Sequence, residues 1–408
     1  MKCLEVSDIT AHISSRKIRF DDSFESFSRL WNLILDSKKR IGATRSRVVA
    51  KWRLFPPEII FSMGAIPYDL LLHEGLVTTK DDEVNPSKYA IEAGLSADCC
   101  PWNLSAVSKI LSKEDDSDID LFLATVGFCD ISSKSWRIMS KKIGKPFYSI
   151  EIPHFNFESE NNAVSFIQQE LSSMVNRLSR RRGYEFSEER LLEEIRKGNF
   201  IRNLVSDITK FLSTQSVPVS ALEYFLIQAS AGDYLQDPDI TGSILNRIKT
   251  EIESRNKNGE SAPGIQDGAP RIYFVGMAPQ QLGFWNLIED CGGVSVGCDT
   301  YLSLFYELIP EHTNVQKELA KWIWRMPHNI PSIERSKMLT SYIKNQNPDA
   351  VIIGNLVGCR NLSQSDRLVK ETIREELGIP ITSLELGASD EDITLLEPHI
   401  RSLIDMCK

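Results

Sequence analysis

Three cysteines stand where their thiols could bind a metal centre together. Cys129 and Cys359 each follow an apolar run typical of a buried strand and precede a polar run typical of a helix. Cys100 directly precedes Pro101 at the start of another helical pattern. In open α/β sheets, ligands gather at the carboxyl ends of the strands. Three thiols brought together there would form a soft, three-sided site suited to an iron–sulfur cluster with one iron left open.

The other cysteines leave alternatives open. Cys99 competes with its neighbour Cys100 as a ligand, and the helical register favours Cys100, which would lie at the positive end of a helix dipole. Free cysteine is also among the most buried residue types, so core packing of all three thiols in a metal-free binding protein is the plain alternative. The remaining cysteines are interpreted as structural or incidental: Cys3, Cys291, Cys298 and Cys407.

The order of apolar runs predicts the elements that must position these thiols. We expect an α/β protein with two similar Rossmann-like (flavodoxin-like) parallel-sheet domains, a helical segment, and the cluster in the cleft between the domains. The two halves close alike, with IGKPFYSIEI in the first and LGIPITSLEL in the second. The predicted boundaries are 1–40 for an N-terminal helical element, 41–155 for the first α/β domain, 156–267 for a helical connector and 268–408 for the second α/β domain.

Composition and missing motifs limit the class of protein. The chain has 408 residues and a net charge of −9, and its longest pure arginine run, 180–182, is short, so nucleic acid is not an expected partner. No stretch approaches the roughly 18 apolar residues of a membrane span, and no signal pattern opens the chain, so we expect a cytoplasmic protein. Gly-rich phosphate loops are absent, so any ATP must be bound by another protein.

Several segments resemble the iron–sulfur subunits of 2-hydroxyacyl-CoA dehydratases and benzoyl-CoA reductases. The resemblance runs from about Val48 to the C-terminus and includes FPPEIIFSMGAIP, DCCPWNLSAVSKI, TVGFCDISSKSW, RIYFVGMAP, MPHNIPSIERSKML and DAVIIGNLVGCRNL. It implies that Cys100, Cys129 and Cys359 ligate the cluster. Arg335 matches an arginine after the Pro-containing turn, and Glu58 matches the acid of the Phe-Pro-x-Glu opening, which makes both residues candidates for catalysis.

The same resemblance implies a function. It implies a [4Fe-4S] cluster in each of two related subunits that form a heterodimer, and a separate ATP-hydrolysing iron–sulfur activator that injects one electron. The substrate would be a CoA thioester whose carbonyl becomes a ketyl-type radical. A dehydratase (a lyase) would then expel a neighbouring hydroxyl, whereas an aryl-CoA reductase (an oxidoreductase) would reduce an aromatic ring, in both cases under anaerobic conditions.

Two departures from the family pattern bear on the substrate. Lys51, Trp52 and Arg53 stand ahead of FPPE, where the dehydratases often carry a hydroxyl residue, and Leu386 and Gly387 follow Glu385 in place of the usual Glu-x-Asp ending. The residues ahead of FPPE fit, as the alternative, an electron-relay or structural subunit whose cluster never meets substrate. Four polar residues flank the expected cluster and could hydrogen-bond its sulfides or the substrate: Asn103, Lys134, Arg360 and Asn361.

Overall fold

The structure is a computed structural model that describes residues 24–76, 86–112, 118–312, 314–363, 365–387 and 390–408. Cys3 and most of the N-terminal element predicted for 1–40 therefore lie outside the described residues. The described part of that element forms α2 (Glu25–Leu35) and continues into α3 (Ser37–Ala43). The apolar side of α2 buries Phe27, Leu30 and Trp31, which ties this helix to the body of the protein.

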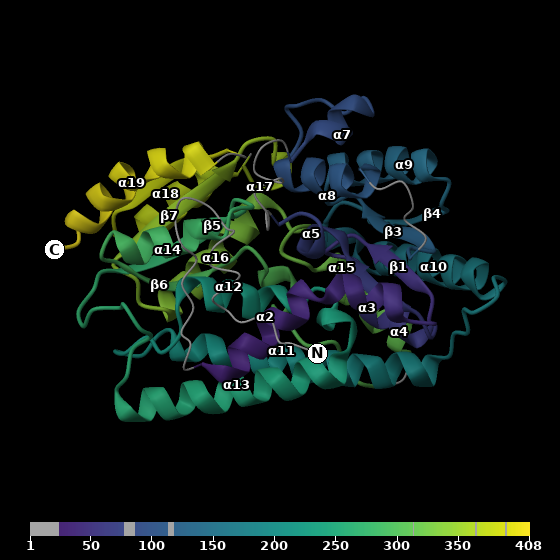
Figure 1. The fold of residues 1–408 in the computed structure, drawn as a ribbon, viewed down its shortest axis with the longest axis horizontal. Coiled ribbons are helices and arrows are strands. Elements are labelled where there is room, and N and C mark those ends of the chain that lie inside the picture. Colours follow the sequence, from purple (N-terminus) through teal and green to yellow (C-terminus); the bar gives the residue numbers. More distant parts are fainter. Residues whose placement is uncertain (1–23, 77–85, 113–117, 313, 364, 388–389) are drawn as a thin grey trace.

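Two four-stranded sheets, each entirely parallel, form the centre of the two halves (Figure 1). The first sheet has the order β2-β1-β3-β4 and the second has the order β6-β5-β7-β8, so each follows the same path through its strands. The predicted α/β class with two similar parallel-sheet domains is thereby confirmed. The strands are β1 (Val48–Lys51), β2 (Ile66–Asp69), β3 (Leu121–Val126), β4 (Phe147–Glu151), β5 (Arg271–Gly276), β6 (Val294–Cys298), β7 (Ala350–Leu356) and β8 (Ile381–Leu386).

The inner strands explain why the sheets are parallel. The first five residues of both β3 and β7 are buried, as expected for strands covered by helices on both faces. In each sheet the strand order reverses beside the first strand, between β1 and β3 and between β5 and β7. Such a reversal leaves a crevice at the carboxyl ends of the strands, where ligands bind in doubly wound folds.

Helices cover both sheets. Those of the first half are α4 (Pro57–Ser62), α5 (Leu70–His73), α7 (Lys88–Glu92), α8 (Pro101–Leu111) and α9 (Asp130–Ile143). Those of the second half are α14 (Gly283–Asp290), α15 (Val315–Trp324), α16 (Ser332–Asn345), α17 (Arg360–Ser363), α18 (Asp366–Leu377) and α19 (Asp390–Asp405). The sequence analysis made no prediction for α19, which packs on β8.

Residues between the two sheets form the expected helical segment. It contains α10 (Glu160–Ser179), α11 (Glu188–Phe211), α12 (Ala221–Ala229) and α13 (Pro238–Asn258), with short 3₁₀ turns at η1 (Phe157–Ser159) and η2 (Tyr234–Gln236). Helix α10 packs on β4 and α15, and α11 packs on α4, α13 and α15. Because each of these two helices touches both halves, the segment fixes one half against the other (Figure 1).

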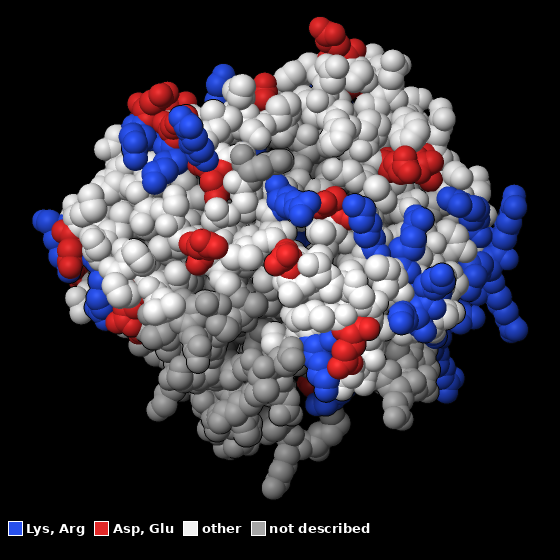
Figure 2. All heavy atoms as spheres, turned by 90° about the horizontal axis from the view of Figure 1, so that it is seen from above, with Lys and Arg blue, Asp and Glu red and all other residues white. Residues whose placement is uncertain are grey.

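Basic side chains are unevenly distributed over the surface. Figure 2 shows Lys and Arg gathered on the side where Figure 1 places β4, α9 and α10, although the whole chain carries a net charge of −9. Exposed basic residues of α9 include Lys134, Arg137, Lys141 and Lys142, and the arginine run 180–182 follows α10. None of the helices that the structure describes is long and apolar enough to cross a membrane.

Candidate functional site

Each of the three predicted ligands directly precedes a helix. Cys100 is the N-cap of α8 and Cys129 is the N-cap of α9. Cys359 directly precedes α17. β3 ends at Val126 and β7 ends at Leu356, so Cys129 and Cys359 are both the third residue after the corresponding strand of their half. The fold therefore places these two thiols at equivalent positions, at the carboxyl ends of the two inner strands.

The first turns of these helices point backbone N–H groups at the thiols. The backbone N–H groups of Trp102 and Asn103 donate to the sulfur of Cys100. Those of Ile131 and Ser132 donate to Cys129, and the Ser132 hydroxyl donates to the carbonyl oxygen of Cys129 at 3.2 Å. The N–H groups of Asn361 and Leu362 donate in the same way to Cys359. Because the first N–H groups of a helix have no partner within the helix, all three sites are built to stabilise negative charge on sulfur.

The three thiols lie in one place. Cys100 interacts electrostatically with both Cys359 and Cys129, and Cys359 also interacts with Cys129. The loop before Cys359 packs on the chain around Cys100, since a Cβ added to Gly358 would lie 2.7 Å from the backbone nitrogen of Cys100. The two halves are therefore in direct contact at this point.

A hydrogen bond joins the other two cysteine loops. Asn361, two residues after Cys359, donates from Nδ2 to the carbonyl oxygen of Phe128 at 2.5 Å. Phe128 directly precedes Cys129, so this bond holds the turn after β3 against the turn after β7. Of the polar residues predicted to flank the thiols, Asn361 thus contacts the loops themselves. Asn103 is buried in the first turn of α8, whereas the side chains of Lys134 and Arg360 are exposed.

Burial dominates the electrostatics of the thiols. Burial raises the pKa of Cys100 to about 12 and that of Cys359 to about 11, and it also raises the pKa of Cys129. The helical N–H donors lower each pKa but do not offset the loss of water. Near neutral pH the metal-free chain therefore holds three neutral thiols. A metal would have to displace their protons, so its binding releases protons and depends on pH.

The donor set fits a cluster better than a single ion. Among the described residues, no three His, Cys, Asp or Glu side chains are placed to hold one metal ion. Ligands to a four-iron cluster bind separate irons and lie farther apart than ligands to one ion. Three thiols, each supplied with N–H donors, match the thiolate ligands and sulfur-directed hydrogen bonds of such a cluster. Cys100 is buried, whereas Cys129 and Cys359 are partly buried. Of the neighbours Cys99 and Cys100, Cys100 is the one that interacts with the other two thiols.

A polar cavity of about 490 Å³ opens beside the cysteine loops. It is lined by Phe128 and Asp130 on either side of Cys129, by Arg360 and Asn361 after Cys359, and by residues 328–332 and Arg335. The candidate residue Arg335 lies in the first turn of α16, and its Nη2 is 2.7 Å from Oδ2 of Asp299 in a buried ion pair. Arg335 also interacts electrostatically with Cys359, so the structure brings this candidate to the thiols.

Glu58, the other catalytic candidate, occupies a different place. Its Oε1 accepts a hydrogen bond from Nη2 of Arg202 at 2.5 Å and another from the hydroxyl of Tyr234 at 2.6 Å. All three side chains are buried, where α4 packs on α11. Glu58 is not among the residues that line the described cavity. The geometry therefore gives this carboxylate a structural ion pair.

Sequence reasoning missed two residues of the site. Asp299 directly follows β6, and burial raises the pKa of its carboxyl group despite the neighbouring Arg335. His328 lines the cavity, and burial together with the positive charges of Arg335 and Arg53 lowers its pKa to about 3. The available signal for Asp299 was its position at the carboxyl end of a parallel strand. His328 stands within the quoted MPHN segment without a spacing that would mark it.

One local match to a hydrolase motif has no catalytic geometry. Residues 293–297 read Gly-Val-Ser-Val-Gly, the pattern of a nucleophile elbow. An elbow requires a sharp turn from strand to helix, but Ser295 lies inside β6 and is 3% exposed. Cys298 ends the same strand, and its thiol donates a hydrogen bond to Oε1 of Gln228 at 2.9 Å. A serine hydrolase site is therefore excluded at this position.

Fold and site together define a double α/β protein. Its thiol site lies where the carboxyl ends of the inner strands of the two halves meet. The chain belongs to the 2-hydroxyglutaryl-CoA dehydratase, D-component family, whose model matches residues 54–407. It is also similar to a protein of Escherichia coli strain K12 with the name "Putative dehydratase subunit YjiM". The two share 21% identity over 362 residues, which cover 86% of this chain and 88% of the relative. The family resemblance found in the sequence is thereby confirmed, and it supports a subunit of the dehydratase type.

Proposed function

We propose that this chain is the iron–sulfur subunit of a 2-hydroxyacyl-CoA dehydratase and that it binds a [4Fe-4S] cluster through Cys100, Cys129 and Cys359. The observation that carries the proposal is that three thiols, each supplied with backbone N–H donors, lie near one another where the two similar halves meet. When bound, the cluster would supply a single electron to the carbonyl of a CoA thioester. The electron would come from an ATP-hydrolysing activator, and a related second subunit would complete a heterodimer.

The chain's own residues would hold and shape the site. Cys100, Cys129 and Cys359 would hold the cluster as thiolates, and three protein ligands would leave a position open for a substrate oxygen or a solvent molecule. The N–H donors at the three helix starts would stabilise charge on the sulfurs and adjust the reduction potential of a bound cluster. Arg335 faces the cavity with its guanidinium held by Asp299, so it can orient an oxygen of the substrate without rotating away.

The substrate would enter by the cavity beside the cysteine loops. Its wall presents Arg335, Asn361 and His328, which suit a thioester carbonyl and its neighbouring hydroxyl better than an aromatic ring. This polarity favours the dehydratase over the aryl-CoA reductase as the reaction type. Because His328 stays neutral near pH 7, it can exchange a hydrogen bond with a hydroxyl group without adding charge.

Anaerobic purification of the full chain with its partner subunit tests the proposal. The expected result is a brown protein with about four irons and four sulfides in this chain, and an electron paramagnetic resonance signal on reduction. Replacing Cys100, Cys129 or Cys359 by serine should lower the iron content, whereas Cys99→Ser and Cys291→Ser should not. A colourless wild-type chain without iron, or iron that persists in the triple Cys→Ser variant, would refute it.

A further inference from the structure

Ser303 is a buried serine whose hydroxyl meets a histidine of the cavity wall. Its Oγ lies 2.6 Å from Nδ1 of His328, and the serine is 1% exposed. His328 is half-buried and lines the cavity beside the cysteine loops. In the part of the chain that the structure describes, His328 is the one hydrogen-bond partner of the Ser303 side chain. This bond therefore joins the core of the second half to the wall of the site.

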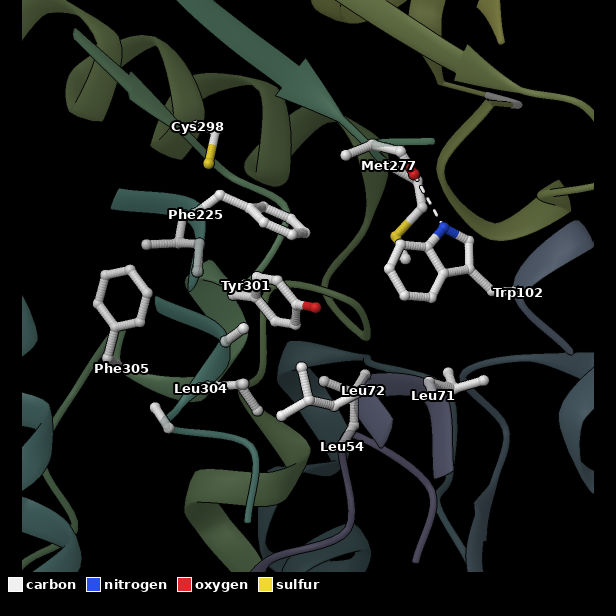
Figure 3. Close-up of a cluster of buried hydrophobic side chains, with 14 of the residues drawn as sticks. Leu54, Leu71, Leu72, Trp102, Phe225, Met277, Cys298, Tyr301, Leu304 and Phe305 are labelled. Atoms are coloured by element: carbon white, nitrogen blue, oxygen red, sulfur yellow. Dashed lines mark hydrogen bonds between the residues drawn. The ribbon is translucent and has the colours of Figure 1, made fainter. Parts of the chain in front are cut away.

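The serine stands on a rigid turn. It is the middle residue of the 3₁₀ turn η3 (Leu302–Leu304), in which the N–H group of Leu304 donates to the carbonyl oxygen of Tyr301 at 2.9 Å. Figure 3 shows Tyr301, Leu304 and Phe305, which lie on either side of the serine in the chain, in a cluster of buried apolar side chains. Because such a core is closely packed, the turn holds the Ser303 hydroxyl in a fixed place.

The backbone around the histidine is held as well. The carbonyl oxygen of His328 accepts a hydrogen bond from Nδ2 of Asn361 at 3.5 Å, and the same amide group also joins the two cysteine loops. The next residue, Asn329, donates from its own Nδ2 to the carbonyl oxygens of Pro153 and Trp324. The imidazole is therefore fixed on two sides, by its ring and by its backbone, with respect to the thiol site.

The serine decides which ring nitrogen carries the hydrogen of a neutral imidazole. If Nδ1 carried it, Nδ1 would donate to Ser303, and the buried hydroxyl hydrogen would have no acceptor among the described residues. An unsatisfied buried donor disfavours this form on the order of fivefold to a hundredfold. In the other form the hydroxyl donates to Nδ1, and the ring hydrogen lies on Nε2. Because Nδ1 faces the buried serine, Nε2–H is the donor left for the cavity.

Nearby charges keep the imidazole neutral, so this choice between two forms applies near pH 7. Burial and the positive charges of Arg335 and Arg53 lower the pKa of His328 to about 3. Arg335 lines the same cavity, and its charge is matched by Asp299. The cavity wall thus presents a cation and a neutral N–H donor close together. Both groups require an acceptor, and an oxygen that gains negative charge during a reaction is the acceptor such donors stabilise best.

We propose that Ser303 is a positioning residue that fixes His328 in the Nε2–H form, so that the imidazole donates a hydrogen bond to an oxygen of the acyl thioester. The inference rests on the proposed function, since it takes a CoA thioester as the ligand in the cavity. It goes beyond that function by giving His328 the role of a donor and by naming the residue that sets this role. A 2-hydroxyacyl thioester offers two such acceptors, its carbonyl oxygen and its hydroxyl oxygen.

Nitrogen-15 chemical shifts of the imidazole test which nitrogen carries the hydrogen, because protonated and unprotonated ring nitrogens have well-separated shifts. The iron-free full chain is labelled with nitrogen-15 histidine, and His328→Gln assigns the signals of this residue among the six histidines. We expect Nε2–H and an unprotonated Nδ1 in the wild type. In Ser303→Ala the ratio of the two forms should move toward one by about fivefold or more. Ser303→Thr, which keeps a hydroxyl, should restore the wild-type ratio.

Binding of three CoA compounds to the anaerobically purified protein identifies the accepting oxygen. Butyryl-CoA carries the carbonyl oxygen, the thioether S-butyl-CoA lacks it, and 2-hydroxybutyryl-CoA adds the hydroxyl. For a bond to the carbonyl oxygen, Ser303→Ala should weaken the binding of both thioesters about twofold to tenfold, the range of one hydrogen bond, and should leave that of the thioether unchanged. A loss confined to 2-hydroxybutyryl-CoA supports the same donor with the hydroxyl as its acceptor. Ser230→Ala, which removes another buried hydroxyl that bonds a backbone carbonyl oxygen, is the control and should change neither the shifts nor the binding.

Several results would overturn the inference. An Nδ1–H form in the wild type does so without any variant, and so does a ratio that Ser303→Ala leaves unchanged. Equal losses of affinity for all three compounds, or no loss for any, would exclude the hydrogen bond to the substrate. If Ser303→Ala does not fold, the wild-type shifts and Ser303→Thr still decide. The shifts are recorded without iron, and iron content is measured in the binding samples, so failure of the cluster assignment and failure of this inference are told apart.

Discussion

The backbone nitrogen of Cys100 lies 2.7 Å from the position that a Cβ on Gly358 would occupy. Gly358 belongs to the second half and Cys100 to the first, so the two halves meet here backbone against backbone. Only glycine leaves room for that contact. Its φ of +78° is a second reason for glycine at this position, because side chains disfavour the left-handed region.

Replacing Gly358 by alanine should therefore weaken both the fold and the thiol site. Backbone strain costs about 1 kcal/mol, and the contact with Cys100 adds roughly 1–3 kcal/mol of overpacking. Urea unfolding of the full chain measures the sum, and iron retained after anaerobic purification measures the effect on the site.

A matched glycine separates these two costs. Gly378, which ends α18, has a φ of +66° and nothing within 4 Å of the added Cβ. Gly378→Ala should lose only the strain and should keep its iron. If Gly358→Ala and Gly378→Ala lose the same stability and the same iron, the close approach of the two halves plays no part.

Local signals allowed the thiol positions to be predicted from sequence. A run of apolar residues ends shortly before Cys129 and Cys359, and Pro101 marks the first helical position after Cys100. Each of these signals depends on residues within a few positions of the cysteine. The likeness of the two halves followed from the same kind of local pattern, since the segments IGKPFYSIEI and LGIPITSLEL close them alike.

Contacts between distant residues could not be predicted in this way. Asp299 and Arg335 form their ion pair across 36 positions, and Arg202 reaches Glu58 across 144. Neither pair has a spacing that a helix or strand would impose. The family motif indicated Glu58 as a candidate catalytic acid. Only the packing of α4 on α11 shows that Arg202 forms an ion pair with it.

The ion pair between Glu58 and Arg202 predicts strong coupling between the two residues. Breaking a buried pair by removing one partner costs about 3–5 kcal/mol, because the other charge stays buried and unpaired. Glu58→Gln and Arg202→Met should each lose stability on this scale. The double variant should lose clearly less than the sum of the two, because it removes both charges together.

The same variants decide whether Glu58 is catalytic. In the structural role, the turnover of each correctly folded Glu58→Gln subunit stays close to that of the wild type. Denaturant unfolding and activity per folded subunit are the two measurements. A Glu58→Gln variant with normal stability and no activity would instead place the carboxylate in the reaction.

The hydrogen bond from Asn361 to Phe128 should control how firmly a bound cluster is held. Asn361→Ala removes the donor and leaves the Phe128 carbonyl oxygen without this bond, which costs on the order of 1 kcal/mol. The effect on the retention of iron should exceed the effect on the free energy of unfolding, because the bond joins the loops of Cys129 and Cys359 directly. We expect Asn361→Ala to lose iron to a chelator faster than the wild type does. Visible absorbance measures the rate of this loss. Asn176→Ala, at an exposed position of α10, should release iron at the wild-type rate, and equal rates for both variants would contradict the prediction.

His328 predicts a specific dependence of stability on pH. Its pKa lies at about 3 in the folded chain, lowered from 6.5 by burial and by Arg335 and Arg53. Between these two values the unfolded chain binds a proton at this position and the folded chain does not. Stability contributed by the neutral imidazole is therefore fully present above about pH 6.5 and is lost as the pH falls toward about 3.

A His328→Gln variant has no group at this position that can bind a proton. Its amide can still form a hydrogen bond with Ser303, whose Oγ lies 2.6 Å from Nδ1 of the histidine. The unfolding free energy of His328→Gln should therefore fall less steeply with acid, by up to one bound proton over this range. Urea unfolding at a series of pH values gives the slope. Parallel curves for the wild type and His328→Gln would mean that the pKa of His328 is the same in the folded and the unfolded chain, so burial and the two arginines would not keep the imidazole neutral below about pH 6.5.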